Sequence, residues 1–242
     1  MNHKSHRVRR VGLALLVIIL ILAVAALVVR FIIIKSEQAD KEQAEIIKNA
    51  KPDESDEGNY LADALKINED TVAWLTIEDT EIDFPIVQSE DNEFYLTHGF
   101  DKSEYERGCP FLDYRNSSDF SDFNSIIYGH NWSNKYVFAP LLSFREQEYF
   151  DSHPSSTLIL PDEKCTIKFI ACAVVENDSF IYSVSHPAES DRLLYLNELS
   201  ECAVTSAEFE PESLVNARLV VLSTCSGDYD TARTVLVGYI EE

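Results

Sequence analysis

The sequence predicts a mostly β domain, either a barrel or a sandwich, that follows one membrane-spanning helix. Three observations lead to this prediction. An uncharged apolar run of 19 residues lies near the N-terminus, at 11–29. The rest of the chain contains seven or eight short segments rich in β-branched and aromatic residues, and their spacing does not fit alternating βαβ units. Only one long amphipathic helix is expected among them, at 190–202.

The N-terminal segment has the pattern of a membrane anchor. Residues 1–10 contain four basic and no acidic side chains, and apolar character continues from 11 to 34. A helix of that length reaches roughly 36 Å, which is enough to cross a bilayer. The positive-inside rule makes 1–10 a cytoplasmic tail, 11–34 a transmembrane helix and the remainder extracellular. A cleaved signal peptide is the alternative, but its apolar region is normally only about 7 to 15 residues long.

The charge of the chain is distributed unevenly. Residues 35–57 are polar and then strongly acidic, which predicts a helical stalk followed by a linker. Residues 1–35 hold six of the 20 Lys and Arg residues and none of the 42 Asp and Glu residues, so the remainder has 14 basic and 42 acidic residues and a net charge of −28. Such a domain repels nucleic acid and favours cationic partners such as peptides with free amines. A solvated acidic surface without a specific partner is the simpler interpretation.

The domain at 58–242 is expected to begin with a short helix at 58–66. Further helical segments are expected at 91–100, within 138–153 and at 190–202, the last inserted between strands. Pro85 lies in the second expected strand and marks an edge or a bulge. The expected strands, recognised by apolar and β-branched residues, are 72–77, 81–88, 108–113, 124–129, 156–162, 165–177, 217–224 and 233–240.

The five cysteines do not form a recognisable disulfide or metal pattern. Their number is odd and no CxxC occurs, so at least one thiol is free unless it pairs between chains. Cys165 and Cys172 lie in one expected strand, which would put them about 23 Å apart, so we do not expect them to pair with each other. The His and Cys positions lack zinc-site spacing, and the acidic residues lack the spacing of a calcium loop. The sequence predicts neither a metal nor a cofactor.

Three residues lie where expected strands end or begin. His130 follows the strand in "NSIIYGHNW", Cys225 ends the strand in "VVLSTC", and Arg233 opens the last strand in "DTARTVLVGY". Strand ends hold side chains rigidly and leave them accessible. A thiolate is a strong nucleophile, histidine can transfer protons, and a guanidinium can stabilise an oxyanion. Together these groups suit acyl transfer, although each can also be structural: a core thiol, a turn histidine and a surface arginine.

The stretches around these residues match a known set of motifs in the same order. "LSTC" at 222–225 is similar to the TLxTC signature of the sortases, with Val221 in place of the first Thr. Arg233 follows Cys225 by eight residues, as the sortase arginine follows its cysteine. "YGHNW" at 128–132 resembles the stretch that carries the sortase histidine. The chain is therefore identified as a member of the sortases.

Further features resemble class B sortases. Ser223 in the signature, the inserted helix at 190–202 and the N-terminal helix at 58–66 are typical of that class. The resemblance covers roughly 58–242, so this range is expected to be the catalytic domain. It implies a mostly β fold, a closed sortase-like barrel of seven to eight strands, preceded by the transmembrane helix. It also implies a single-pass membrane protein of a Gram-positive cell that needs no calcium.

The resemblance implies a transpeptidase. Cys225 attacks the carbonyl after the Thr of an LPxTG- or NPxTN-like sorting signal on a surface protein and forms a thioacyl enzyme. His130 protonates the leaving amine, and Arg233 stabilises the oxyanion. The acyl group then passes to an amine of lipid II or of another peptidoglycan precursor. Residues implied in binding the signal, for which ordinary loop and core packing is the alternative, are Ser223, Asn92, Leu96, Ile181 and Tyr182.

Three other functions remain open. A class B sortase can polymerise pili, in which case the acceptor is a pilin lysine. A cysteine peptidase or amidase that acts on cell-wall peptides normally has its cysteine before its histidine, whereas here His130 precedes Cys225. A non-enzymatic acidic surface protein would need neither a free activated thiol nor Arg233.

Overall fold

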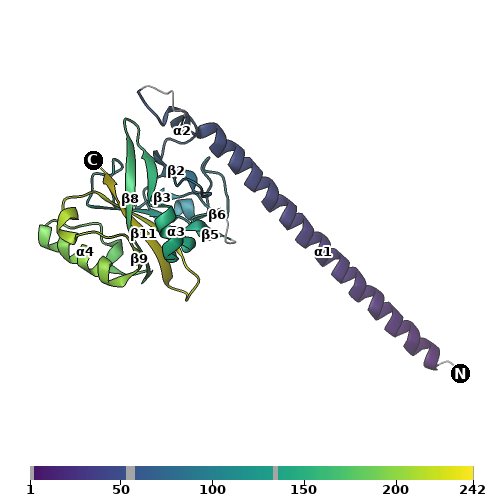
Figure 1. Cartoon of the computed structure of the whole chain (residues 1–242). Coiled ribbons are helices and arrows are strands. Elements are labelled where there is room, and N and C mark those ends of the chain that lie inside the picture. The colour runs from purple at the N-terminus through teal and green to yellow at the C-terminus, as the bar shows by residue number, and fades with distance from the viewer. Residues whose placement is uncertain (1–2, 53–57, 133–135, 242) are drawn as a thin grey trace. The chain divides into compact units, whose positions relative to one another are not determined.

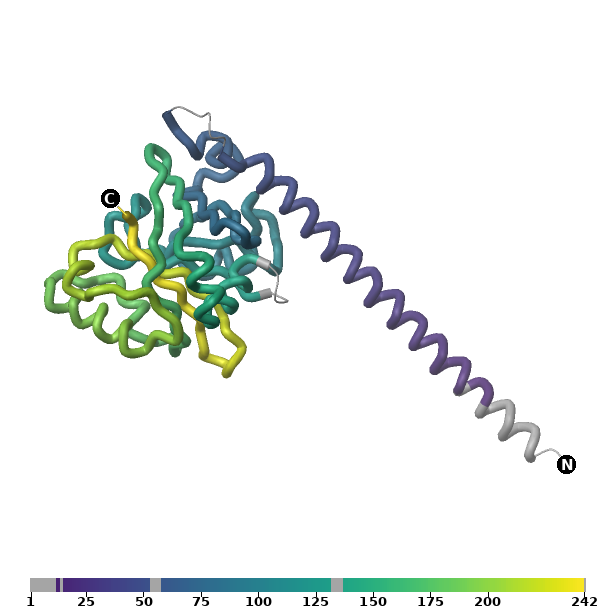
Figure 2. The backbone as a smooth tube through the Cα atoms, viewed as in Figure 1, coloured from purple at the N-terminus to yellow at the C-terminus, as the bar shows by residue number. Residues whose placement is uncertain are grey.

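The structure is a computed structural model of the 242-residue chain, and it describes residues 3–52, 58–132 and 136–241. The chain divides into two compact units, residues 1–45 and residues 46–242. Helix α1 (His3–Ala50) is continuous through the apolar run and the polar residues after it. Figure 2 traces the same path of the backbone.

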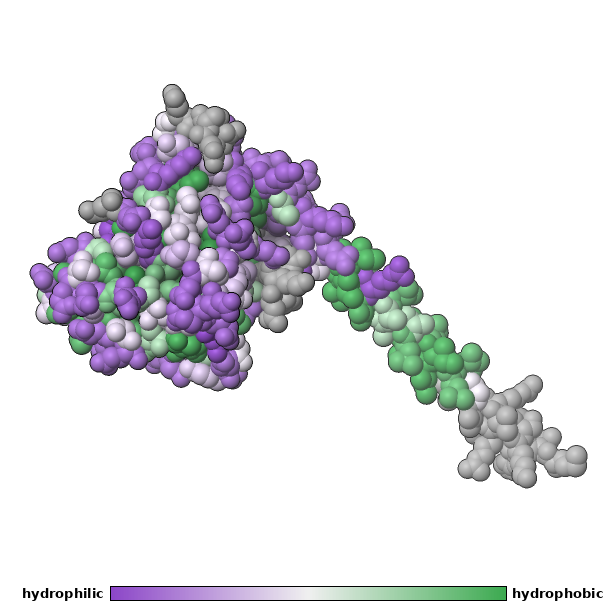
Figure 3. All heavy atoms as spheres, in the orientation of Figure 1, coloured by the Kyte–Doolittle hydropathy of each residue, from purple (hydrophilic) through white to green (hydrophobic). Residues whose placement is uncertain are grey.

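Helix α1 has the composition of a membrane anchor in its N-terminal half. From Leu15 onward it is long and apolar enough to cross a bilayer, and none of its apolar window is buried. Figure 3 shows a largely hydrophobic surface along this part of the helix, with one hydrophilic patch within it. A helix that is apolar on nearly all sides is typical of a membrane span. The helix ends at Ala50, whereas residues 53–57 of the expected linker lie outside the described residues.

Eight strands of the described residues form a closed barrel in the second unit (Figure 1). Their order is β11-β10-β4-β3-β2-β1-β7-β8, and β8 pairs back onto β11. The pairs β10–β4 and β2–β3 are parallel and the other pairs are antiparallel. The strands are β1 (Thr71–Thr76), β2 (Asp83–Val87), β3 (Phe111–Leu112), β4 (Asn124–Tyr128), β7 (Ser155–Ile159), β8 (Lys164–Glu176), β10 (Leu219–Cys225) and β11 (Ala232–Glu241).

Shorter elements decorate the barrel. Strand β9 (Ala203–Ser206) adds to β8 outside the closed ring, and β5 (Asn131–Trp132) pairs with β6 (Tyr136–Val137). The helical elements are α2 (Ala62–Ile67), η1 (Phe94–Leu96), η2 (Ala139–Arg145), α3 (Gln147–Ser152), η3 (Phe180–Tyr182), α4 (Glu189–Cys202) and η4 (Pro211–Leu214).

Alternation along β10 decides which way its side chains point. Val220 and Leu222 lie in the core inside the barrel, whereas Leu219 and Val221 lie in a second core that also contains residues of α4. Successive side chains of a strand point to opposite faces. Thr224 therefore continues the inner set, and the residues on either side of it continue the outer set.

The observed fold confirms the predicted mostly β class, and it is a closed barrel rather than a sandwich. The eight expected strands and the inserted helix are present, the latter as α4. The β5–β6 hairpin and β9 were not predicted, because strands of two to four residues are too short to show a period. All five cysteines are free thiols.

Candidate active site

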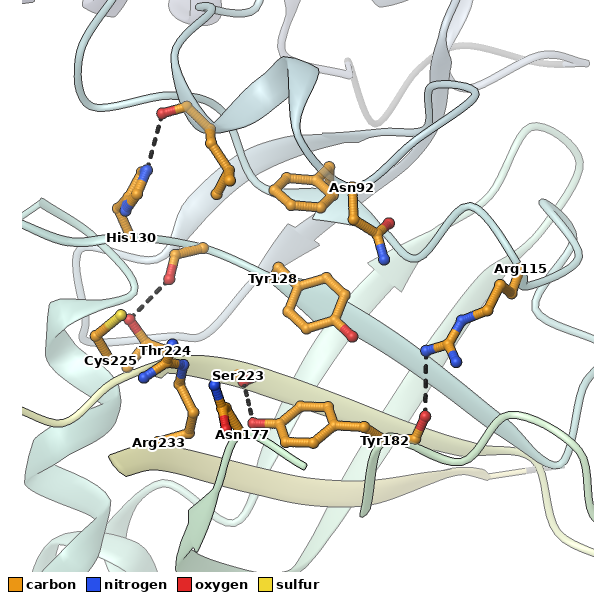
Figure 4. A pocket seen from close by; sticks show the side chains of 13 residues that line it. Asn92, Arg115, Tyr128, His130, Asn177, Tyr182, Ser223, Thr224, Cys225 and Arg233 are labelled. Carbon is orange, nitrogen blue, oxygen red and sulfur yellow. Dashed lines mark hydrogen bonds between the residues drawn. The ribbon is translucent and has the colours of Figure 1, made fainter. Parts of the chain in front are cut away.

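A cavity of about 440 Å³ lies on the outer face of the barrel wall, above β4, β10 and β11. Figure 4 shows His130, Cys225 and Arg233 at one end of it and Arg115 at the other. Seven of the eight residues expected at the site line this cavity: Cys225, His130, Arg233, Ser223, Asn92, Leu96 and Tyr182.

Cys225 and Arg233 are direct neighbours across two antiparallel strands. Cys225 is the last residue of β10, and its partner on β11 is Arg233. Residues directly opposite in such a pair point to the same face, with Cβ atoms about 4.5–5.5 Å apart. Within the described ranges no carboxylate pairs with Arg233, whose Nη1 donates to the Ala232 carbonyl at 3.0 Å. An uncompensated guanidinium therefore lies beside an exposed thiol.

Three hydrogen bonds fasten the histidine segment to the cysteine strand. Gly129 N donates to the Ser223 carbonyl at 3.0 Å, and Thr224 Oγ1 donates to the Gly129 carbonyl at 2.7 Å. Asn131 Nδ2 donates to the Cys225 carbonyl at 2.8 Å. The residues before and after the histidine are thus bound to the strand that ends in the thiol.

The ring of His130 is oriented by a main-chain carbonyl. Its Nε2 lies 2.8 Å from Leu96 O, and because a carbonyl oxygen can only accept, Nε2 carries the hydrogen (Figure 4). In the neutral ring this leaves Nδ1 free to accept a proton. Leu96 therefore holds the histidine through its backbone, a role that its side chain did not suggest.

The main-chain N–H that follows the thiol is already engaged. Ser226 N donates to the Ala232 carbonyl at 3.1 Å and closes the loop between β10 and β11. The loop is also held by Asp228, which accepts a bidentate pair from Arg145 at 2.9 and 3.1 Å. Arg233 is consequently the charged donor that remains available next to Cys225.

The other four thiols are shielded from ionisation. Burial is the largest cause of the raised pKa in each of them, and it raises the pKa of Cys172 to about 12. Burial likewise raises the pKa of each of the remaining three thiols, Cys109, Cys165 and Cys202. Because thiolates are the reactive form, these four are poor nucleophiles. Cys225 is the one cysteine with an exposed side chain.

A buried carboxylate at the far end of the cavity was missed from the sequence. Asp113 has no exposed side-chain surface and accepts from Arg115 Nε at 2.8 Å and from Arg115 Nη2 at 2.7 Å. It also accepts from the Tyr128 hydroxyl at 2.9 Å. Burial alone would raise the pKa of Asp113, but the hydrogen bonds from Arg115 and Tyr128 lower it below its ordinary value. The available signal was an Asp at the end of an expected strand, with an Arg two residues later.

Tyr182 connects the two ends of the cavity. Its hydroxyl lies 2.8 Å from Ser223 Oγ, and its carbonyl accepts from Arg115 Nη2 at 3.1 Å. Its ring stacks on that of Tyr128 with 6.1 Å between centroids. These contacts form a rigid, partly aromatic wall between the thiol and Arg115.

Ile181 lies elsewhere, contrary to the expectation that it contacts the sorting signal. Its side chain has no exposed surface and packs in the second core, together with residues of α4. Its carbonyl accepts from Asn124 Nδ2 at 2.9 Å. Ile181 thus anchors η3 in the second core, whereas its neighbour Tyr182 lines the cavity.

Comparisons with known proteins agree with this architecture. No protein-family model matches the chain. Over 180 residues the chain is 34% identical to a sortase B of Listeria monocytogenes, covering 74% of this chain and 72% of that protein. The chain belongs to the class B sortases. This sortase also resembles the X-ray structure of Clostridium perfringens sortase B, with a TM-score of 0.70, 29% identity and coverage of 75% and 99%.

A second solved structure extends the comparison to pili. A Streptococcus pyogenes class B sortase involved in pilus biogenesis aligns with a TM-score of 0.66 and 32% identity, covering 74% of this sortase and 97% of that chain. The family and the closed barrel predicted from the sequence are confirmed. In the described part of this sortase, no group of three or more His, Cys, Asp and Glu side chains is placed to hold a metal ion.

Proposed function

We propose that this class B sortase is a cysteine transpeptidase in which Cys225 is the nucleophile, His130 the proton donor and acceptor, and Arg233 the donor to the oxyanion. The observation that carries the proposal is the register of β10 and β11, which puts the exposed thiol directly opposite a guanidinium that pairs with no carboxylate among the described residues. The hydrogen bonds of Gly129 and Asn131 hold the histidine at the same end of the cavity.

The proposed reaction has two acyl-transfer steps. The Cys225 thiol passes its proton to Nδ1 of His130, and the thiolate attacks the Thr carbonyl of an LPxTG- or NPxTN-like signal. The negative charge that develops on oxygen is stabilised by Arg233. The C–N bond then breaks, and the leaving amine takes a proton from His130. The thioacyl group remains on sulfur until a second amine attacks it. That amine passes its proton to His130, and the thiolate is regenerated.

The proposed acceptor is an amine of lipid II or of another peptidoglycan precursor. A net charge of −28 on residues 36–242 favours the approach of a cationic amine over that of an anion. A pilin lysine is the second candidate, because a relative at 32% identity is involved in pilus biogenesis. Both acceptors are primary amines and both follow the same chemistry.

The proposed location is the cell membrane. Residues 11–34 would form a single span, the basic residues 1–10 would remain in the cytoplasm, and 35–57 would connect the span to an extracellular catalytic domain at 58–242. The apolar helix from Leu15 and the basic residues before it support this arrangement. It places the cavity on the side of the membrane where surface proteins and peptidoglycan precursors meet.

A peptide panel tests the proposal. The full chain, held in detergent micelles, is incubated with LPxTG-, NPxTN- and SPxTG-type peptides, with and without a lysine-containing or stem-peptide amine. Mass spectrometry should show cleavage after Thr and a new amide with the added amine. Hydrolysis that no amine can divert would favour a cysteine peptidase, and no cleavage of any peptide would contradict the proposal.

A further inference from the structure

The guanidinium of Arg115 has one unused edge at the end of the cavity away from Cys225 (Figure 4). Its Nε and Nη2 donate to Asp113, and Nη2 also donates to the carbonyl of Tyr182. Within residues 3–52, 58–132 and 136–241, Nη1 makes no hydrogen bond. The side chain is 39% exposed and lines the cavity.

The free edge is held in a fixed orientation. Both oxygens of the buried Asp113 are occupied, Oδ1 by Arg115 Nε and Oδ2 by Arg115 Nη2 and the Tyr128 hydroxyl. A guanidinium locked by a bidentate pair loses little further freedom when it binds a ligand. If Arg115 had only a structural role, its contacts with Asp113 and Tyr182 would be sufficient, and these use Nε and Nη2 but not Nη1.

The chemistry of the edge determines what it can bind. Guanidinium N–H groups only donate, so the partner must be an acceptor, and an oxygen is the common one. Asn92 lines the same cavity, and its Oδ1 already accepts from Tyr114 N at 3.0 Å, which turns its donating Nδ2 toward other partners. Two donors therefore lie along this part of the cavity.

Charge selects among the possible acceptors. The positive charge of Arg115 is already balanced by Asp113, and residues 36–242 together have a net charge of −28. A carboxylate would gain little from a neutralised pair and would be repelled by the domain. An amide or hydroxyl oxygen avoids this repulsion.

We propose that Arg115 is a specificity-determining residue, whose Nη1 binds an amide or hydroxyl oxygen on a side chain of the sorting signal, N-terminal to the Thr and at the end of the signal away from the scissile bond. This inference rests on the proposed transpeptidase function, because it assumes that the acyl segment of the peptide occupies the cavity while Cys225 holds its Thr carbonyl.

The test is a substitution scan of the peptide in parallel with variants of Arg115. In the best-cleaved panel peptide, each residue N-terminal to the Thr is replaced in turn by Asn, Asp and Leu. The full chain is compared with Arg115→Lys and with the double variant Arg115→Met, Asp113→Asn, which leaves no unpaired buried charge. Arg218→Lys, whose ion pair with Glu163 does not line the cavity, is the matched control.

One peptide position should couple to Arg115. There, at least two residues before the Thr, wild type should cleave the Asn peptide about tenfold faster than the Leu peptide in kcat/KM, the lower end for a hydrogen bond to a charged group because the side chain is partly exposed. The Asp peptide should be poorer than the Asn peptide. The preference should disappear in the double variant, weaken in Arg115→Lys and persist in Arg218→Lys.

Other results would overturn the inference. An equal loss for every peptide in the Arg115 variants, or coupling only at the residue beside the Thr, would remove the assigned role. Alkylation of Cys225 by a small maleimide should proceed at the wild-type rate in the variants, and a slower rate would show that the substitutions damage the whole site. Failure of wild type to cleave any peptide would instead contradict the proposed function itself.

Discussion

Replacement of Gly129 by alanine should inactivate the enzyme far more than it destabilises it. Gly129 lies between β4 and His130 and has no room for a side chain. A Cβ there would approach Cδ2 and Cγ of Phe138 to 2.6 Å and Cγ1 of Val137 to 3.0 Å. Comfortable carbon contacts are about 3.5–4.0 Å, so the ring and the new methyl group would overlap by about 1 Å.

The overlap can be relieved only by moving parts of the site. Phe138 is completely buried, and its N–H donates to the His130 carbonyl at 3.0 Å. Either the ring moves in the core, at about 1–3 kcal/mol of unfolding free energy, or the backbone of the histidine moves away from the thiol. A displacement of about 1 Å in a catalytic group can lower the rate by about 100-fold.

Gly238→Ala provides the matched control. A Cβ at Gly238 would also meet its neighbours at 2.6 Å, namely Cγ2 of Ile167 and the carbonyl of Lys168, but none of these residues lines the cavity. Urea denaturation gives the stability of both variants, and peptide cleavage is measured where both are folded. Gly129→Ala should lose about 100-fold in kcat/KM and Gly238→Ala should retain near-normal activity. Near-normal turnover of folded Gly129→Ala, or an equal loss in Gly238→Ala, would refute the reasoning.

Three further predictions follow from the site. Arg233→Lys should lose most of the cleavage activity, because an ammonium does not reproduce the guanidinium fork, and near-normal kcat would exclude an oxyanion role. Iodoacetamide at neutral pH should modify Cys225 of the native chain before the other four thiols, as peptide mass mapping would show, because burial raises the pKa of those four. Asp113 has a lowered pKa in the folded state, so its contribution to stability is complete above its unfolded pKa of about 4 and is lost as pH falls through the folded value. The stability deficit of Asp113→Asn in urea denaturation should accordingly be largest at neutral pH and shrink in acid, and a deficit that grows in acid would contradict the assigned direction.

The sequence predicted those parts of the fold that local patterns determine. The strand that ends in Cys225 and the strand that begins near Arg233 are long and apolar, and both were located to within a few residues. Their antiparallel pairing follows from the short loop between them. The helix at 190–202 was recognised by its apolar spacing and is α4, Glu189–Cys202.

The parts that were not predicted depend on contacts between distant segments. Asp113 falls at the end of an expected strand, and only the fold places the Tyr128 hydroxyl against it. The carbonyl of Leu96 carries no side-chain signal, so its bond to His130 appears only in the structure. Ile181 lies in a helical turn of three residues, which is too short for its sequence pattern to show which side chain faces the cavity and which faces the core. The free edge of Arg115 also depends on the fold, because it is defined by which of its nitrogens bind Asp113 and Tyr182.

The most direct test of the central claim is the mass of the enzyme during turnover. The full chain is mixed with its best-cleaved peptide without an amine, quenched in acid within the first turnovers and digested for peptide mass mapping. The peptide that contains Cys225 should carry the mass of the acyl segment up to and including Thr, and added amine should remove it. Cys225→Ala should keep the fold and show neither adduct nor cleavage. Cleavage by Cys225→Ala, or an adduct on another residue, would contradict the account.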